Sequence, residues 1–335
     1  MAKKIGVIGA GGWGTALAVL LSENGNEVSL YEHFPEYAVK LRVQKENKTF
    51  LPGVKIPRGV VITSSLAEAV KGAAIILFAV PSKHLPGVLE LMDTGSLKKG
   101  AIFVSAIKGI DRTTLKRMSQ LISGRFGKKF EVAVLSGPSH AEEVGRKTPT
   151  AVVIAAKKIK TAEILQEVFS GPYFRVYASD DVIGVELGGA VKNVIALAKG
   201  VLDGMGLGDN TTAALMTRGL AEMKRLGRKL GARPETLNGL SGTGDLIVTC
   251  MSRHSRNRSV GERLGKGEKL PAILASMEMV AEGVTTADSC HRLAKKLGVE
   301  MPIAREMYRI LFRGASPAGA VKALMGRKLK REEVQ

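Results

Sequence analysis

Short apolar runs alternate with helical stretches over roughly the first 180 residues of the chain. The runs are rich in Val, Ile, Leu and Ala and stop at glycine, proline or a charged residue, which is typical of strands buried on both faces of a parallel sheet. The pattern predicts helices over residues 15–22, 65–72 and 162–169, and strands over residues 3–9, 27–31, 60–63, 73–80, 101–106, 131–135, 150–156 and 173–177. We also expect capping boxes at Ser65 with Glu68 and at Ser139 with Glu142.

The pattern changes to helices alone after residue 180. A long, almost wholly apolar helix is predicted at 184–203, and further helices at 210–230, 271–277, 286–297, 302–312 and 317–325. We therefore predict an α/β protein with a Rossmann-type N-terminal domain and a mostly parallel sheet over residues 1–180. An all-α C-terminal domain is predicted over residues 181–326, and the basic residues 327–335 are expected to be a disordered tail.

A glycine-rich turn follows the first predicted strand and opens the first helix. Such glycines let a helix N-terminus and its free N–H groups approach a pyrophosphate, and Glu32 ends the next strand at about the 20-residue distance of a ribose-binding acid. A turn without a ligand is the alternative, but the complete strand, helix and acid context favours a dinucleotide site. The glycines of this turn are Gly9, Gly11, Gly12 and Gly14.

Two neighbouring residues make opposite predictions about the cofactor. Glu32 would accept a hydrogen bond from an adenosine 2′-hydroxyl and repel a 2′-phosphate, which favours NAD. Protonated His33 would instead bind that phosphate, which favours NADP. Either residue could also be a plain exposed loop residue, so the sequence leaves the choice between NAD and NADP open.

One lysine interrupts the long apolar helix. Apolar residues cover most of its helical wheel, so Lys192 either extends to solvent or stays enclosed. An enclosed lysine loses hydration, its pKa falls, and it can exchange a proton near neutral pH. Gly188 and Gly189 weaken the helix and indicate that another backbone or a ligand comes close. On this helix alone, a side chain that extends to solvent is the favoured interpretation.

Several polar residues stand just after predicted strands or at the start of predicted helices, and packing of a core does not account for them. Lys108 and Ser139 come after predicted strands, at the sheet edge where ligands of doubly wound folds gather. The turn 241–245 ends in Asp245, an expected helix N-cap, and the cluster 252–259 combines arginines, hydroxyls and a helix start. Together these groups predict a phosphate site, with simple capping and solvated arginines as the alternatives.

Composition narrows the classes of function. The 335 residues suffice for two domains, and the formal net charge of +19 suits anionic partners such as phosphorylated small molecules. Aromatic residues make up only 4%, too few for base stacking, so no specific nucleic-acid binding is expected. The two cysteines form neither a disulfide framework nor a metal spacing, and no apolar run approaches the roughly 20 residues of a membrane span. We expect a cytoplasmic protein without membrane insertion and without a metal.

Eight motifs resemble those of the bacterial NAD-dependent glycerol-3-phosphate dehydrogenase family, and they extend over almost the whole chain. As a set they are far more specific than any one of them. They are GAGGWGTA at 9–16, AVPS at 79–82, SAIKGI at 105–110, SGPSHAEE at 136–143, GGAVKNVIA at 188–196, SGTGDLIVTC at 241–250, SRNR at 255–258 and VAEG at 280–283.

The resemblance implies an oxidoreductase that interconverts dihydroxyacetone phosphate and sn-glycerol 3-phosphate with NAD(P)H and supplies phospholipid synthesis. Lys192 is then the catalytic proton donor and acceptor. The family has a small residue in place of Glu32, which puts its usual preference for NADPH in doubt. The implied substrate-binding residues are Lys108, Gly137, Ser139, Lys192, Asp245, Ser255, Arg256 and Asn257. The implied cofactor contacts beyond the glycine turn are Trp13, His33, Lys108, Ala141, Arg256, Val280 and Glu282.

Two other functions stay open. One is a two-domain dehydrogenase for an unphosphorylated hydroxy acid, against which the basic cluster 252–259 argues. The other is a non-enzymatic NAD(H)-binding redox sensor that uses its positive charge to bind DNA. The sequence does not determine the physiological direction or the oligomeric state, for which a homodimer is the expectation.

Overall fold

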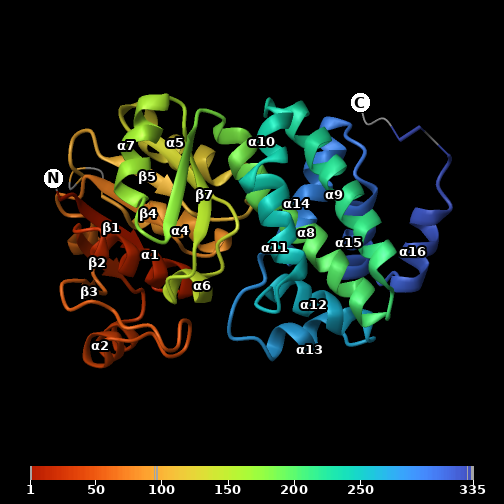
Figure 1. The fold of residues 1–335 in the computed structure, drawn as a ribbon, viewed down its shortest axis with the longest axis horizontal. Coiled ribbons are helices and arrows are strands. Elements are labelled where there is room, and N and C mark those ends of the chain that lie inside the picture. Colours follow the sequence, from red (N-terminus) through yellow and green to blue (C-terminus); the bar gives the residue numbers. More distant parts are fainter. Residues whose placement is uncertain (1, 94, 96, 330, 333–335) are drawn as a thin grey trace. The chain divides into compact units, whose positions relative to one another are not determined.

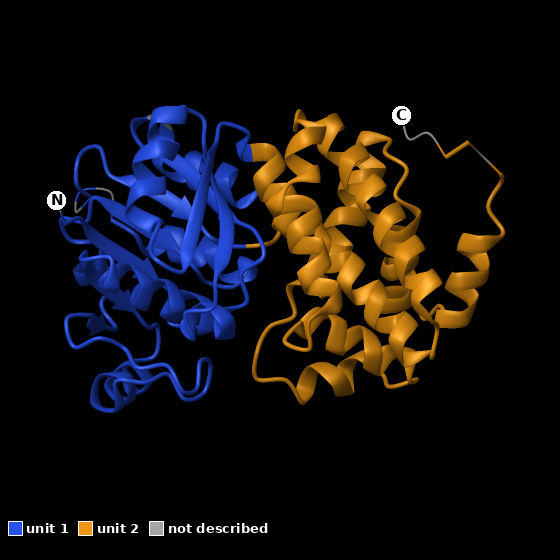
Figure 2. Cartoon of the chain, viewed as in Figure 1, with its two compact units in different colours: residues 1–107, 117–182 blue, residues 108–116, 183–335 orange. Residues whose placement is uncertain are grey.

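The computed structural model describes residues 2–93, 95, 97–329 and 331–332. The chain forms two compact units (Figure 2): unit 1 comprises residues 1–107 and 117–182, and unit 2 comprises residues 108–116 and 183–335. Unit 1 contains the sheet, and unit 2 is helical. A short segment that follows a strand of the sheet, residues 108–116, therefore belongs to the helical unit.

Unit 1 is built on one eight-stranded sheet. Its strands are β1 (Lys4–Ile8), β2 (Glu27–Tyr31), β3 (Val61–Thr63), β4 (Ile75–Phe78), β5 (Ile102–Ser105), β6 (Glu131–Ser136), β7 (Thr150–Ala156) and β8 (Phe174–Ser179). The order is β3-β2-β1-β4-β5-β6-β7-β8, and all neighbours are parallel except β6 and β7. The predicted Rossmann-type sheet is confirmed. Its strand order reverses between β1 and β4, which is where ligands bind in such sheets.

Helices cover both faces of this sheet (Figure 1). They are α1 (Gly12–Glu23), α2 (Pro35–Gln44), α3 (Leu66–Val70), α4 (Leu85–Leu91), α5 (Met118–Phe126), α6 (Ala141–Gly145) and α7 (Ile159–Phe169). Successive strand residues point to opposite faces, so Ile75 and Leu77 of β4 pack with α1 and α7, whereas Ile76 and Phe78 pack with α3, α4 and α5. The glycine-rich turn follows the carboxyl end of β1, a central strand of this sheet.

The two predicted capping boxes have different outcomes. Ser65 Oγ accepts the Glu68 N–H at 3.3 Å, but the Glu68 carboxylate accepts the hydroxyl of Thr63 instead of closing the box. The second box is wrong, because Ser139 lies one residue outside the N-cap position of α6. Its hydroxyl donates to the Gly137 carbonyl at 2.9 Å, the kind of local turn bond that competes with helix capping.

Unit 2 packs its helices around α8 (Figure 1). Every residue of α8 from 184 to 202 is buried, so the prediction of an enclosed helix is confirmed. The helices of the unit are α8 (Val182–Gly204), α9 (Asp209–Leu230), α10 (Pro234–Asn238), α11 (Asp245–Met251), α12 (Arg256–Gly265), α13 (Leu270–Ala275), α14 (Glu282–Leu297), α15 (Pro302–Arg313) and α16 (Pro317–Met325).

Glycines allow backbones to meet α8 directly. A Cβ at Gly200 would stand 2.0 Å from a carbonyl oxygen of α12, and a Cβ at Gly261 would stand 2.0 Å from one of α8. Gly188 was predicted to allow the approach of another backbone, and it lies against the π-helical turn Leu240–Gly244. A Cβ at Gly188 would stand 2.3 Å from the Ser241 carbonyl oxygen. These approaches place the starts of α11 and α12 close to the middle of α8.

No helix among the described residues is long and apolar enough to cross a membrane. Residues 330 and 333–335 of the expected disordered tail lie outside the described residues. In the part of the tail that is described, Arg327 pairs with Glu300, and Glu332 pairs with Arg218 of α9 at 3.4 Å.

Candidate active site

Lys192 lies in the middle of α8 with its side chain enclosed. The residue is only 5% exposed, so it does not extend to solvent. The apolar surface of α8 offers this side chain no wet face. Its ammonium group must therefore be satisfied inside the protein.

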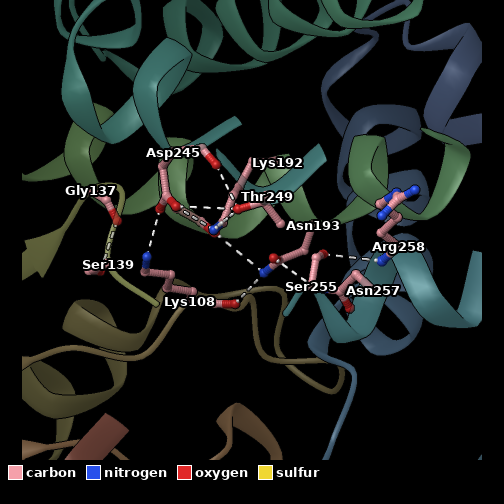
Figure 3. Close-up of polar contacts among 11 residues, drawn as sticks. Lys108, Gly137, Ser139, Lys192, Asn193, Asp245, Thr249, Ser255, Asn257 and Arg258 are labelled. Atoms are coloured by element: carbon pink, nitrogen blue, oxygen red, sulfur yellow. Dashed lines mark hydrogen bonds and ion pairs between the residues drawn. The ribbon is translucent and has the colours of Figure 1, made fainter. Parts of the chain in front are cut away.

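Two ammonium groups meet on one buried carboxylate (Figure 3). Lys192 Nζ donates to Asp245 Oδ1 at 2.5 Å, and Lys108 Nζ donates to Asp245 Oδ2 at 2.7 Å. Asp245 is 0% exposed. We call Lys108, Asp245 and Lys192 the charge triad. With both lysines protonated, the triad carries one excess positive charge in an enclosed site.

Asp245 does not cap its helix, contrary to the prediction. It is the first residue of α11, and its carboxylate faces the two lysines because their charges require a partner. Thr249, one turn later, donates its hydroxyl hydrogen to the Asp245 backbone carbonyl at 2.6 Å and accepts from Lys192 Nζ at 2.5 Å. An ammonium has three donors, and no other described residue accepts the third, so it is free for a ligand.

Burial and charge set the proton affinities of the triad. Burial lowers the pKa of Lys192 to about 8, with Asp245 opposing the shift and Lys108 adding to it. Burial alone would raise the pKa of Asp245, but Lys108 and Lys192 outweigh burial and hold that pKa below its usual value. Asp245 therefore stays ionised near neutral pH, while Lys192 can gain or lose its proton there.

A chain of amides fixes the backbone at Lys108. Asn193 Nδ2 donates to the Lys108 carbonyl at 3.1 Å, and Asn257 Nδ2 donates to Asn193 Oδ1 at 2.9 Å. Asn257 Oδ1 in turn accepts the Gly283 N–H at 2.8 Å. The side chain of Asn257, implied by the resemblance to bind substrate, is thus buried within a network that joins α8, α12 and α14.

The predicted anion site lies at the N-terminus of α12. Ser255 caps the helix by accepting the Arg258 N–H at 3.2 Å, which leaves other first-turn N–H groups without helical partners. Arg258 is occupied, because its Nε donates to Asp203 at 2.7 Å. Arg256 is exposed, and its side chain bonds no described residue. Of these two arginines, Arg256 is the one available to an anion.

The glycine-rich turn of unit 1 is closely packed at two of its glycines and open at a third. A Cβ at Gly14 would stand 1.8 Å from the Gly9 carbonyl oxygen, and a Cβ at Gly12 would stand 2.5 Å from that of Phe50. The chain itself therefore requires these glycines. Apart from its two chain neighbours, no residue that the structure describes comes within 4 Å of the place where a Cβ of Gly11 would stand. That open space adjoins the first-turn N–H groups of α1, which have no helical partners and are the kind of donors that bind phosphate groups.

Further expected cofactor and substrate residues lie in unit 1. The Ala141 Cβ is 3.6 Å from the place of a Gly12 Cβ, and Trp13 Nε1 is buried without a hydrogen-bond partner among the described residues. Gly137 and Ser139 follow β6 in the same unit. The remaining implied cofactor contacts belong to unit 2: Lys108, Arg256, Val280 and Glu282, the first residue of α14.

Glu32 is part of the turn that follows β2. It is buried, and its Oε1 accepts the Phe34 N–H at 3.0 Å. Burial raises the pKa of Glu32, while the N–H groups of Phe34 and His33 and the ring of His33 oppose the shift. Glu32 is therefore not a plain exposed loop residue. His33 is exposed, with its Nδ1 3.2 Å from the Tyr31 hydroxyl.

Sequence reasoning missed two residues that support these sites. Thr249 could have been found from its position four residues after Asp245, which puts both on one face of α11. Asn47 had no such signal. It is fully buried and donates to the Ala10 carbonyl at 2.7 Å and to Thr15 Oγ1 at 2.8 Å, while its Oδ1 accepts from Tyr37 at 2.7 Å. Asn47 thus fixes the backbone of the glycine-rich turn.

Cys250 and Cys290 are buried, and burial raises the pKa of each thiol to about 12, which leaves them unreactive. Among the residues that the structure describes, no group of three or more His, Cys, Asp and Glu side chains is placed to hold a metal ion.

Comparisons with known proteins agree along the whole chain. Two family profiles match: NAD-dependent glycerol-3-phosphate dehydrogenase N-terminus over residues 4–162, and the C-terminus of the same name over residues 181–322. The glycerol-3-phosphate dehydrogenase (NAD(P)+) of Citrifermentans bemidjiense is 51% identical over 336 residues, which is 100% of both chains. That of Moorella thermoacetica is 51% identical over 98% of this chain and 97% of its own. A crystal structure of glycerol-3-phosphate dehydrogenase from Coxiella burnetii matches with a TM-score of 0.93 and 36% identity, over 97% of this chain and 99% of that one.

The contrast between Gly11 and Gly14 gives a test of the cofactor site. We expect Gly11→Ala to leave the melting temperature near that of wild type, because the new methyl enters open space, but to weaken NADH binding at least about tenfold by blocking the pyrophosphate. Gly14→Ala should lower the melting temperature itself, because its methyl would meet the Gly9 carbonyl. Calorimetric titration with NADH and thermal unfolding measure both effects. Wild-type affinity in a folded Gly11→Ala protein would exclude this turn from the site.

Proposed function

The chain belongs to the NAD-dependent glycerol-3-phosphate dehydrogenase family, and on that premise we propose that it interconverts dihydroxyacetone phosphate and sn-glycerol 3-phosphate with NAD(P)H. The product would supply phospholipid synthesis. Family membership extends over both parts of the chain. It therefore favours this activity over the hydroxy-acid dehydrogenase and the DNA-binding sensor considered above.

The charge triad is the observation that carries the proposal. Ketone reduction places negative charge on an oxygen and then requires a proton, and the triad offers both a positive field and a proton donor. Lys192 has a free third donor and a pKa of about 8, close to the pH at which a general acid or base works best. A lysine with its ordinary pKa would be a poor base in the reverse direction.

Each residue of the site then has a definite task. The nicotinamide, when bound, supplies or accepts the hydride at C2 of the substrate. Lys192 and Lys108 stabilise the negative charge on the C2 oxygen, and the Lys192 ammonium gives that oxygen a proton. In the oxidation direction the Lys192 amine takes the hydroxyl proton. Asp245 and Thr249 hold the Lys192 nitrogen in place throughout.

The substrate phosphate is assigned to the start of α12. Arg256 and the first-turn N–H groups supply charge and directed donors, so their binding energy orients C2 for reaction. Ser255 and Asn257 shape this helix start, and Gly137 and Ser139 are further substrate contacts proposed from the resemblance.

The assignment divides the chain as the sequence suggested. We assign cofactor binding to residues 1–180 and substrate binding and catalysis to residues 181–326, with Lys108 as the exception. A cytoplasmic location and a homodimer are part of the same proposal. Light scattering of the purified protein measures the oligomeric state.

One assay tests the proposed activity. Consumption of NADH and of NADPH is followed by absorbance with dihydroxyacetone phosphate as substrate, and with unphosphorylated dihydroxyacetone as the control. We expect turnover only with the phosphorylated ketone. Absence of turnover with both cofactors would overturn the proposal.

Lys192 should control both the rate and its pH dependence. For reduction, kcat/KM should fall as pH rises through about 8, because the ammonium is the required form, and for oxidation it should rise through the same value. Lys192→Ala should lower kcat by at least about 100-fold, the usual loss for a general acid or base, with little change in cofactor affinity. Steady-state rates over a pH series measure both effects.

A matched control is Lys199→Ala, which removes another buried lysine of α8 that pairs with Asp203 outside the triad. A loss of less than about tenfold in Lys192→Ala would contradict the assignment of the general acid.

Arg256 should act on the substrate phosphate. Arg256→Ala is expected to raise KM for dihydroxyacetone phosphate, and inorganic phosphate should inhibit the variant less than the wild type, because both anions lose the same guanidinium. Arg253→Ala, which removes an exposed arginine just before the helix, is the control. Unchanged KM and unchanged phosphate inhibition in Arg256→Ala would remove this helix start from the site.

Glu32 should favour NADH over NADPH. Its carboxylate repels a 2′-phosphate, so NADH should be used at least as well as NADPH. Glu32→Gly should shift the preference towards NADPH by about 1–3 kcal/mol, the size of one charged hydrogen bond. The ratio of kcat/KM for the two cofactors measures this shift.

Glu32→Gln is the matched control, since it keeps an acceptor for the Phe34 N–H and removes only the charge. A wild type strongly selective for NADPH, or a Glu32→Gly variant with the wild-type ratio, would show that Glu32 only shapes the turn.

A further inference from the structure

The segment that carries Lys108 is hydrogen-bonded along its backbone to helices of unit 2, the unit to which it belongs. In residues 108–116, the carbonyls of Lys108, Ile110 and Arg112 each accept a side-chain hydrogen bond. In the same order, their donors are Asn193 Nδ2 at 3.1 Å, Ser289 Oγ at 3.1 Å and Arg292 Nη1 at 2.7 Å. Lys108 and Ile110 precede a turn at residues 112–114, in which the Leu115 N–H bonds the Asp111 carbonyl at 3.0 Å, and Arg112 is the first residue of this turn.

Helix α14 provides most of these bonds. Besides Ser289 and Arg292, its Asp288 accepts from Arg112 Nε at 2.7 Å. Ser289 is fully buried, and its single hydroxyl hydrogen is shared between the Ile110 carbonyl at 3.1 Å and the Thr285 carbonyl of α14 at 3.2 Å. The start of α14 is also connected to the Lys108 carbonyl, through Gly283, Asn257 and Asn193. The segment is therefore tied to one helix along much of its length.

We propose that Asp288, Ser289 and Arg292 are positioning residues that hold the Lys108 ammonium against Asp245. Within the described part of the chain, none of the three bonds a member of the charge triad, so each acts through the backbone of the segment. A lysine side chain has several rotatable bonds, and its ammonium is well located only where its backbone is fixed. The inference rests on the activity proposed above.

A positioning role can be told apart from a merely stabilising one. The charged or titratable groups that act on Lys192 are Asp245, Lys108 and Cys250, and Lys108 acts to lower the pKa of Lys192. If the segment shifts and Lys108 moves away, the pKa of Lys192 should rise. Loss of stability alone would not move this pKa in a protein that remains folded.

The test compares Ser289→Ala and Arg292→Met with Lys108→Met. Arg292 is half exposed, so its replacement should not prevent folding. Both α14 variants are expected to lower kcat/KM for dihydroxyacetone phosphate by about 10- to 100-fold, the scale of a displacement of up to about 1 Å at a reacting group. Both should also move the pH limb assigned to Lys192 upward, as is expected of Lys108→Met, and Arg292→Lys should restore part of the rate.

Thr286→Val is the matched control, because the Thr286 hydroxyl is also buried on α14 but has no hydrogen-bond partner among the described residues. It should keep the wild-type rate and pH limb. Wild-type rates in Ser289→Ala and Arg292→Met would overturn the proposal, and so would a lower rate with an unmoved pH limb.

A second readout separates this inference from the proposed function. Pulse acetylation followed by peptide mass spectrometry gives the pKa of Lys192 without turnover. If the wild type does not reduce dihydroxyacetone phosphate, the proposed function fails, yet an upward shift of this pKa in both α14 variants would still support the positioning role. An unshifted pKa would overturn that role.

Discussion

The structure of unit 2 depends on one buried carboxylate held between two lysines. Removing Asp245 from water costs several kcal/mol, which is offset only if both of its oxygens have strong partners. Lys192 comes from α8, Asp245 from α11, and Lys108 from the segment after β5. These three segments must therefore be held in fixed positions relative to one another. The close glycine contacts of α8 and the hydrogen-bonded amides of Asn193 and Asn257 hold them there.

Much of the fold could be predicted because burial leaves a local pattern. Runs of β-branched and aliphatic residues indicate strands, and an apolar helical wheel indicates an enclosed helix, whatever the partners are. Where little is buried, this pattern is weak. Helix α2 was not predicted, because only Ala38 and Leu41 of this helix are buried. The Pro35 at its first turn was the usable signal.

The chemistry of the candidate site was less accessible to sequence reasoning. An aspartate at a helix start looks the same whether it caps the helix or pairs with distant lysines, and its partners here are 53 and 137 residues away along the chain. The enclosed Lys192 could be suspected from its helix, but not the lowered pKa, which needs the burial and charges of the folded site. Asn257 was correctly placed at a helix start, while its bond to Asn193 depends on the packing of α8 against α12.

Lys108 belongs to the first half of the chain by sequence and to the helical unit by structure. A fragment that begins at residue 183 would keep Asp245 and Lys192 but lose the second cation of the carboxylate. Recombination between related genes at the apparent domain boundary would likewise exchange Lys108 together with the dinucleotide-binding half. The two halves of this protein are therefore not independent modules in evolution, because a foreign first half must bring a segment that fits the α14 of its new host.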